Sequence, residues 1–431
     1  MVPWAALSAV IFLVSKRRIV LKTAGGKKRR IFPFSKGVSA VISAVLSLVF
    51  IAAAAVNADL ASYIRYLLAE PSAFIEDNYV DPKGVGITFP EDKQNLIVIY
   101  LESMETSFLS ADKGGANDVD PLPELYRLAG ENVNFSQNGS VGGFTSPYGT
   151  DWTIAALVSF ASGVPLKVPA GSDGNEYGGD SFLPNLTTIN DILNENGYYQ
   201  AFMCGSDSSF GSRRQFYKNH CVDDVFDITT ARKESIVAKN YKVWWGMEDL
   251  HLFEYAKKKL TEISKGDKPF AFSMLTVDTH HVGGYYCSLC KREFPEQYEN
   301  VIACSSRQVY DFVNWIKKQD FYSNTTIVIL GDHPTMDNEY AQRNIAKDYD
   351  RKVYNCIINP RVTTDNTKNR EVLTFDMFPT MLAAIGCKIE GDRLGLGANL
   401  FSGEPSLGEK YKKEDLNSML SERSVFYEEF Y

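Results

Sequence analysis

Four uncharged, apolar runs constrain the fold of this chain more than any other feature of its sequence. They are NLIVIYL (95–101), PFAFSMLTV (269–277), TTIVILG (325–331) and VYNCIIN (353–359). Runs of this length and composition are typical of strands that are buried on both faces of a sheet. Stretches with the apolar spacing of helices occupy 151–163, 187–197, 250–266 and 306–319. The alternation predicts one α/β domain over residues 93–431, with helices on both faces of its sheet.

The first 58 residues differ from the rest and are predicted to form a membrane anchor (1–58). The segment 37–58 has 22 residues without a charge, enough for a helix to cross a bilayer. The uncharged segment 1–14 is short for a complete span. The region 1–36 carries nine basic residues, which lie in the loop between these two segments and are expected to keep it cytoplasmic. A cleaved signal peptide is the main alternative, but its apolar region is usually shorter than 37–58.

The two parts of the chain differ in the sign of their net charge. The net charge of −8 combines +9 in residues 1–36 with −17 in residues 37–431. An acidic body argues against binding to nucleic acid, which needs basic side chains to neutralise phosphates. Hydrophobic residues make up 45% of the chain, which excludes a disordered protein or a small disulfide scaffold. Residues 59–92 are interpreted as a connector near the membrane surface, with a helix packed on the domain as the alternative.

Polar residues that follow the predicted strands indicate a catalytic centre, because ligands bind at the carboxyl ends of strands in such sheets. Glu102 follows the first run, and Asp332 with His333 follows the third. Two carboxylates and an imidazole suit a divalent metal ion. The second run leads into His280 and His281, so strand ends hold three of the five histidines of the chain. Each residue alone is also compatible with an ordinary surface or capping role.

A hydroxyl near Thr150 is a further candidate. The loop 142–149 is rich in glycine and serine and leads into a predicted helix whose first turn begins near Thr150 and Asp151. Backbone N–H groups at a helix N-terminus favour a bound phosphate, which Thr150 is then placed to attack. The residues alone favour a different reading, in which Thr150 or Asp151 is an ordinary N-cap.

Five motifs in a fixed order favour a catalytic role for these residues over an ordinary capping or surface role. They are ESMET (102–106), GTDWTIA (149–155), LTVDTHH (275–281), GDH (331–333) and LGLGANLFSG (394–403). Their order and spacing resemble the membrane-bound phosphoglycerol transferases of the alkaline phosphatase and sulfatase superfamily. The likeness is greatest to the branch that modifies periplasmic glucans, and lipoteichoic acid synthases are more distant. The resemblance implies a sulfatase-like α/β/α sandwich preceded by transmembrane helices.

The resemblance also assigns roles to single residues. It implies a metal site formed by Glu102, Thr150, Asp332 and His333, with Thr150 also the nucleophile. His280 is expected to contact the transferred group, and His280 or His281 to protonate the leaving oxygen. Lipoteichoic acid synthases surround the glycerol with a His, a Trp and an Arg, where this chain has Cys204, Gly211 and Arg213. Arg213 is therefore the expected substrate contact, and Asp207 is a nearby candidate.

The implied reaction is transfer of phosphoglycerol from phosphatidylglycerol to an envelope glycan or polymer through a covalent threonine intermediate. One divalent ion is expected, Mn²⁺ first, with Mg²⁺ or Zn²⁺ as alternatives. The implied location is a bacterial cytoplasmic (inner) membrane with the catalytic domain outside. A phosphoethanolamine transferase or a metal-dependent phosphodiesterase of the same fold is the enzymatic alternative. An inactive, membrane-anchored glycan-binding protein is the non-enzymatic one. A sulfatase is disfavoured, because no cysteine has the C-x-P-x-R context that formylglycine formation needs.

The chain has seven cysteines. Relatives in the glucan-modifying branch carry cysteine at the positions of Cys290 and Cys304, which implies a disulfide between them in an oxidising compartment. The spacing of Cys287 and Cys290 (CSLC) also resembles half of a zinc site. The sequence offers no second pair at matching spacing, so we expect the disulfide.

Overall fold

The computed structural model describes residues 20–22, 25–26, 28–30, 36–57, 64, 66–168, 175 and 181–431. The predicted short apolar segment 1–14 lies outside them. The longer predicted segment forms helix α2 (Lys36–Asn57), and part of the basic loop forms an antiparallel pair, β1 (Val20–Lys22) and β2 (Lys28–Arg30). Among the helices of these described residues, none combines the length and apolarity needed to cross a membrane.

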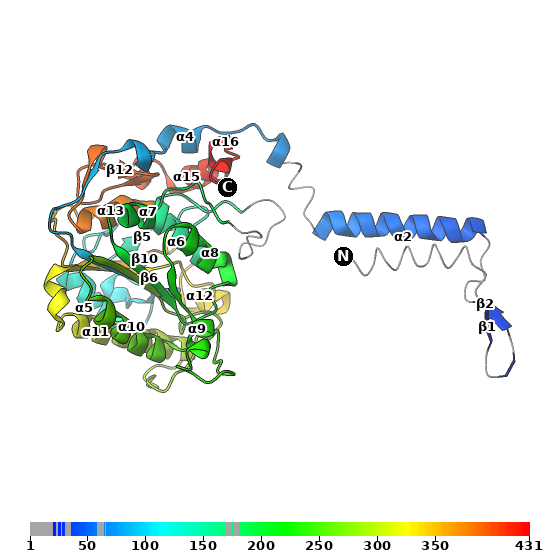
Figure 1. Cartoon of the computed structure of the whole chain (residues 1–431), viewed down its shortest axis with the longest axis horizontal. Coiled ribbons are helices and arrows are strands. Elements are labelled where there is room, and N and C mark those ends of the chain that lie inside the picture. The colour runs from blue at the N-terminus through cyan, green and yellow to red at the C-terminus, as the bar shows by residue number, and fades with distance from the viewer. Residues whose placement is uncertain are drawn as a thin grey trace. The chain divides into compact units, whose positions relative to one another are not determined.

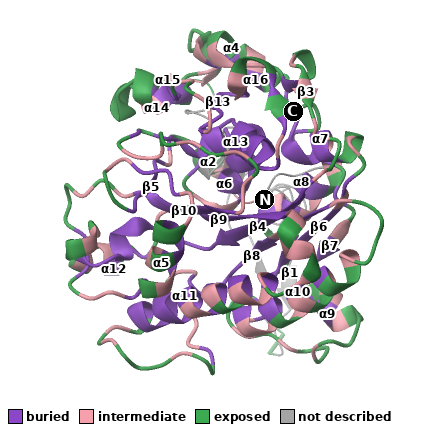
Figure 2. Cartoon of the chain, turned by 90° about the vertical axis from the view of Figure 1, so that its left-hand side faces the viewer, coloured by how far each residue is buried: buried purple, intermediate pink, exposed green. Residues whose placement is uncertain are grey.

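The described residues within Pro71–Lys167 and Gly174–Tyr431 form a second compact unit, called the body below (Figure 1). Its centre is a sheet in the order β5-β10-β9-β4-β8-β6-β7, in which the strands from β9 to β7 run parallel (Figure 2). Strands β10 and β5 are antiparallel to their neighbours. The bounds are β4 (Asn95–Leu101), β5 (Gly143–Phe144), β6 (Tyr199–Cys204), β7 (Asp224–Phe226), β8 (Phe270–Leu275), β9 (Thr325–Gly331) and β10 (Val353–Ile358).

Both faces of this sheet are buried, as the continuous apolar runs predict (Figure 2). Successive side chains of a strand point to opposite faces, so Val98 of β4 joins one hydrophobic cluster and Ile97 and Ile99 join the other. Buried residues of four helices cover the Val98 face: α6 (Thr153–Ser162), α7 (Ile189–Glu195), α8 (Arg213–Asn219) and α13 (Met377–Ala384). Three others cover the opposite face: α5 (Pro123–Glu131), α10 (Asp249–Ile263) and α11 (Gln297–Ile316).

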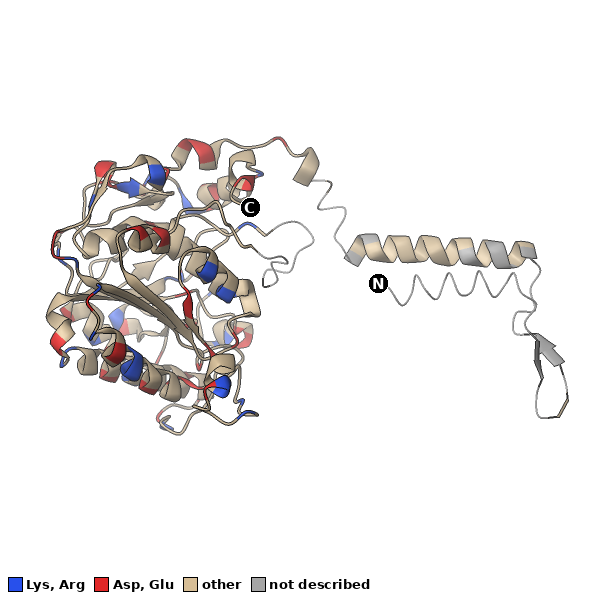
Figure 3. Cartoon of the chain, viewed as in Figure 1, with Lys and Arg blue, Asp and Glu red and all other residues tan. Residues whose placement is uncertain are grey.

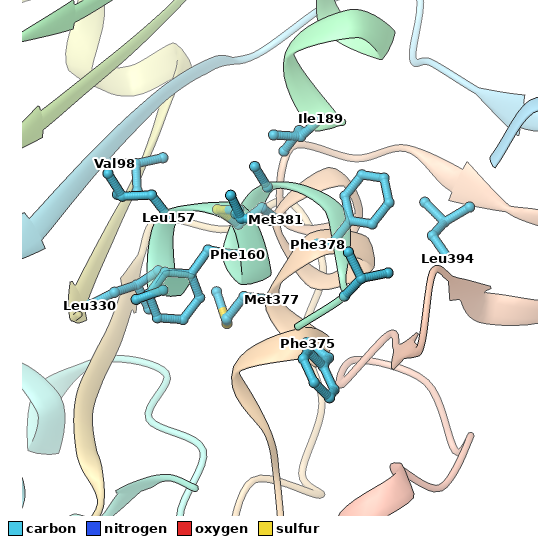
Figure 4. Packing of buried hydrophobic residues seen from close by; sticks show 14 of the residues in the cluster. Val98, Leu157, Phe160, Ile189, Leu330, Phe375, Met377, Phe378, Met381 and Leu394 are labelled. Atoms are coloured by element: carbon cyan, nitrogen blue, oxygen red, sulfur yellow. The ribbon is translucent and has the colours of Figure 1, made fainter. Parts of the chain in front are cut away.

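Helix α6 lies between the sheet and helix α13. Leu157 and Phe160 of α6 lie between the strand residue Val98 and the side chain of Met381 in α13 (Figure 4). Phe160 also stacks on Tyr100 of β4, with ring centroids 5.8 Å apart. Apolar packing on two sides fixes the position of this helix, and with it the first helical residue at the edge of the sheet.

The four predicted strands are confirmed with bounds within two residues. The predicted helix 306–319 is the second half of α11, which begins nine residues earlier at Gln297. The segment interpreted as a connector belongs to the body from Pro71 onward: Ile75 is buried in the core, and β3 pairs with β11. The remaining elements of the body are α4 (Phe74–Asn78), β3 (Ile87–Thr88), α9 (Ile228–Lys233), α12 (Asn338–Asn344), β11 (Lys388–Ile389), β12 (Arg393–Leu394), β13 (Gly397–Ala398), α14 (Leu407–Lys410), α15 (Lys413–Ser421) and α16 (Val425–Glu428).

Candidate active site

The structure brings Glu102, Asp332 and His333 together at the carboxyl edge of the sheet. Strands β4 and β9 are parallel neighbours, with Leu101 opposite Gly331, so the residues that follow the two strands meet. The Nε2 atom of His333 lies 3.5 Å from Glu102 Oε1 and 3.5 Å from Asp332 Oδ2. All three residues are at most 2% exposed. The three groups therefore form a compact set of donor atoms, as the strand ends predict.

Hydrogen bonds from the backbone and from Ser103 orient these three side chains. The Ser103 hydroxyl donates to Glu102 Oε1 over 2.7 Å, and the Ser103 N–H donates to Asp332 Oδ1 over 2.7 Å. Nδ1 of His333 lies 2.9 Å from the carbonyl of Pro334. A carbonyl can only accept, so this contact places the ring proton on Nδ1 and leaves the Nε2 lone pair facing the carboxylates. Such an arrangement is typical of a histidine that binds a metal ion.

The charges within the set depend on one another. Burial and the charge of Glu102 raise the pKa of Asp332 to about 7. Burial opposes charge on His333, but Asp332 and Glu102 together raise its pKa. The other oxygen of Asp332, Oδ2, is buried and has no hydrogen-bond partner. An orphaned carboxylate oxygen beside a second carboxylate and an imidazole nitrogen fits a divalent cation, which accepts mixed oxygen and nitrogen ligands.

The hydroxyl beside this set comes from Thr153, a residue that the sequence analysis did not select. Thr153 Oγ1 lies 3.3 Å from Glu102 Oε2 and 3.3 Å from His333 Nε2. It is the first residue of α6, so the packing of that helix against the sheet positions it. Thr153 could have been identified from the sequence as a threonine at the first position of a helix that begins at the sheet edge.

The structure gives Thr150 a different environment. The helix begins at Thr153, with Trp152 as the N-cap, two to three residues after the predicted start near Thr150 and Asp151. Gly149 adopts a positive φ of 75°, and the following turn directs the Thr150 hydroxyl to the carbonyl of Pro147, 2.8 Å away. Thr150 is fully buried there. Its expected roles as nucleophile and metal ligand stay predictions, with Thr153 the threonine that contacts Glu102 and His333.

A pocket of about 190 Å³ opens beside Glu102 and Thr153. Its lining includes Arg213, as the resemblance implies. Arg213 is 5% exposed, and its guanidinium donates to Ser206 Oγ over 3.0 Å and to the carbonyl of Asp207 over 2.8 Å. The carboxylate of Asp207 accepts from the Ser209 N–H over 2.9 Å and from its hydroxyl over 2.7 Å. Arg213 therefore presents a fixed positive charge to the pocket, while Asp207 mainly shapes its own loop.

The two histidines after β8 lie together near the same pocket. His280 lines the pocket, and its Nδ1 lies 2.9 Å from the carbonyl of His281. As at His333, this contact places the proton on Nδ1 and leaves Nε2 for a substrate. The two imidazole rings stack with centroids 4.4 Å apart. Burial and the neighbouring His280 lower the pKa of His281, so its neutral form dominates near pH 7.

The pocket residues that the sequence analysis did not select include Phe210, Lys242 and Trp245. Trp245 is 40% exposed, packs on Phe210 with centroids 5.8 Å apart, and contacts the ring of His280 at 4.6 Å. The expected position of a tryptophan, Gly211, carries no side chain. The tryptophan of the pocket thus comes from another segment of the chain, and no motif within that segment indicates that it folds onto the pocket.

Cys290 and Cys304 are free thiols in the structure, and the disulfide between them stays a prediction. A third sulfur, that of Cys287, lies close to both. Its Sγ atom is 3.6 Å from that of Cys290 and 3.7 Å from that of Cys304.

Comparisons with known proteins identify related sequences and related folds. The sulfatase family model matches residues 94–387. Phosphoglycerol transferase I of Escherichia coli O6:K15:H31 is 32% identical over 328 residues, which cover 74% of this chain and 40% of that protein. The chain thus spans less than half the length of this relative. A solved structure of an alkaline phosphatase superfamily protein from Vibrio parahaemolyticus shares the fold with a TM-score of 0.55 and 20% identity, covering 77% of this chain and 76% of that one. The lipoteichoic acid synthase LtaP from Listeria monocytogenes shares it with a TM-score of 0.57 and 18% identity, covering 77% of this chain and 82% of that one.

Proposed function

The chain belongs to the sulfatase family, and we propose that it is a phosphotransferase that moves phosphoglycerol from phosphatidylglycerol to an envelope glycan or polymer. The observation that carries this proposal is the Thr153 hydroxyl, set 3.3 Å from two members of a buried three-residue donor set. A hydroxyl in this position serves covalent transfer of a phosphoryl group. The similarity to phosphoglycerol transferase I supports the choice of the transferred group.

Glu102, Asp332 and His333 would hold one divalent cation, Mn²⁺ first, with Mg²⁺ or Zn²⁺ as alternatives. A bound cation supplies positive charge that favours the threonine alkoxide and stabilises the phosphoryl oxygens. The proposed donor group is a phosphodiester with one negative charge. Lys and Arg are interspersed with Asp and Glu over the body (Figure 3). Because the described residues of the body show no surface of one sign of charge in Figure 3, recognition of the phosphate is assigned to the pocket, through the buried Arg213 and through Lys242.

The reaction proceeds in two displacements. Thr153 reacts as its alkoxide: Oγ1 attacks the phosphorus, the bond from phosphorus to the diacylglycerol oxygen breaks, and His280 in its protonated form donates a proton to that oxygen. The phosphoglyceryl group is then bonded to Thr153. In the second step His280, now neutral, accepts the proton of an acceptor hydroxyl, whose oxygen attacks the phosphorus and releases Thr153 again as the alkoxide. Each step retains the phosphodiester, so no other reactant is needed.

The charge of the pocket favours phosphoglycerol over phosphoethanolamine. Arg213 and Lys242 are both positive, and the Asp207 carboxylate is engaged by Ser209. A neutral glycerol avoids the repulsion that a cationic ethanolamine would meet beside two cations. We expect the full chain, given labelled phosphatidylglycerol and labelled phosphatidylethanolamine in parallel, to transfer only the glycerol label to glycan. Transfer of the ethanolamine label, or release of free glycerol phosphate as the sole product, contradicts this proposal.

We also propose that the N-terminal region attaches the enzyme to a membrane, with the body on the outer side. The support is the sequence pattern: an uncharged segment at 37–58 preceded by nine basic residues. The proposed lipid donor stays in the bilayer, so attachment to the membrane keeps the enzyme close to its donor. After alkaline carbonate extraction of cell membranes, we expect the full chain in the pellet and a chain beginning at Pro71 in the supernatant. Recovery of the full chain in the supernatant contradicts membrane attachment.

A further inference from the structure

Three cysteine sulfurs converge outside the pocket described above. Cys287 and Cys290 lie in the loop that follows His280 and His281, and Cys304 lies on α11. The sulfur of Cys287 is 3.6 Å from that of Cys290 and 3.7 Å from that of Cys304. Cys287 and Cys304 are buried, and Cys290 is partly exposed. The three sulfur atoms all lie within 4.8 Å of one another.

The spacing of these sulfurs is that of metal ligands. Sulfurs bound to one tetrahedral zinc ion at 2.3 Å are separated by about 3.8 Å, the edge of the tetrahedron. A disulfide instead requires a separation of about 2.05 Å. The two measured contacts lie close to the first value, and Cys287 makes both of them. A disulfide between any two of the three would leave the third thiol without its partner.

An N–H donor is also directed at this cluster. The side-chain amide of Gln308 donates to the sulfur of Cys304 over 3.5 Å. Donors around sulfur stabilise a thiolate, and such contacts orient and tune the ligands of metal sites.

We propose that Cys287, Cys290 and Cys304 bind a soft divalent cation, zinc first, at a site separate from the proposed catalytic metal site. Thiolates select such ions over magnesium or manganese. Three protein ligands leave a fourth position for water or for another side chain.

The consequence of this site is structural. Cys287 and Cys290 belong to the loop that starts at His280, and Cys304 belongs to a helix packed on the sheet. A bound ion joins the loop to the helix and so restricts the position of the two histidines. This inference does not depend on the proposed reaction, because any chemistry at His280 would use the same support.

Metal content of the full chain tests the proposal. We expect Cys290→Ser and Cys304→Ser each to lower bound zinc by about one ion per chain, because a three-ligand site seldom survives loss of a thiolate. Cobalt added to the metal-free wild type is expected to give the near-ultraviolet charge-transfer absorption of cobalt bound to thiolate. Cys221→Ser is the matched control, since Cys221 is an exposed free thiol outside the cluster, and it is expected to keep both signals.

Two results would overturn the proposal. One is an unchanged zinc content in Cys290→Ser and Cys304→Ser that are shown by circular dichroism to be folded. The other is a disulfide among the three cysteines, found by mass spectrometry of the unreduced wild type. His333→Ala separates this site from the catalytic one, because it is expected to leave the cobalt–thiolate absorption unchanged.

Discussion

Replacing Thr153 by alanine is expected to lower phosphoglycerol transfer by about 10⁴-fold or more, the scale seen when a nucleophile is removed. This corresponds to about 5.5 kcal/mol of transition-state stabilisation. The reason is the position of its hydroxyl, 3.3 Å from Glu102 and 3.3 Å from His333. The measurements are the rate of label transfer and mass spectrometry of the enzyme after incubation with phosphatidylglycerol. The wild type should carry a phosphoglyceryl group on Thr153, and the variant should not.

Three further variants make this prediction specific. Thr153→Ser keeps a hydroxyl and is expected to retain part of the activity. Thr261→Ala removes an exposed threonine hydroxyl on α10 and is expected to have no effect. Thr150→Ala tests the sequence-based assignment, since that hydroxyl donates to Pro147 in the structure. An adduct on Thr150, with full activity in Thr153→Ala, would show that the sequence-based assignment is right and ours is not.

Replacing His333 by alanine is expected to weaken binding of the catalytic cation by about 100-fold or more, because one of three ligands is lost. The loss also leaves the carboxylates of Glu102 and Asp332 buried without the imidazole, and their repulsion disfavours the ionised forms that bind metal. Transfer activity is expected to fall with occupancy and to recover partly at high Mn²⁺. Competition against a chromogenic chelator measures the affinity directly.

His251→Ala is the matched control for this variant. His251 lies on α10 with its side chain 41% exposed, beside Glu248 and Glu254. Its replacement is expected to change neither cation affinity nor activity. If His333→Ala binds Mn²⁺ as tightly as the wild type, His333 is not a ligand and the proposed metal site is incorrect.

Much of the fold follows from the sequence because its signals are local. The central strands carry continuous apolar runs, and burial on both faces of one sheet selects such runs. The strand bounds of β4 and β9 agree with prediction residue by residue. The start of α11 was missed, because its first turns carry buried polar residues such as Glu299 and Asn300, and Asn300 donates a hydrogen bond to the loop just before the helix.

The sequence by itself determined the α/β sheet and the strand ends that bear Glu102, Asp332 and His333, because parallel neighbours must bring those ends to one edge. Only the tertiary structure decided which threonine faces them. Thr150 and Thr153 are three residues apart, and the choice depends on where α6 begins and how it packs. The third sulfur beside Cys290 and Cys304 was likewise decided by tertiary contacts, since the distances that join a loop to a helix are not encoded in local spacing.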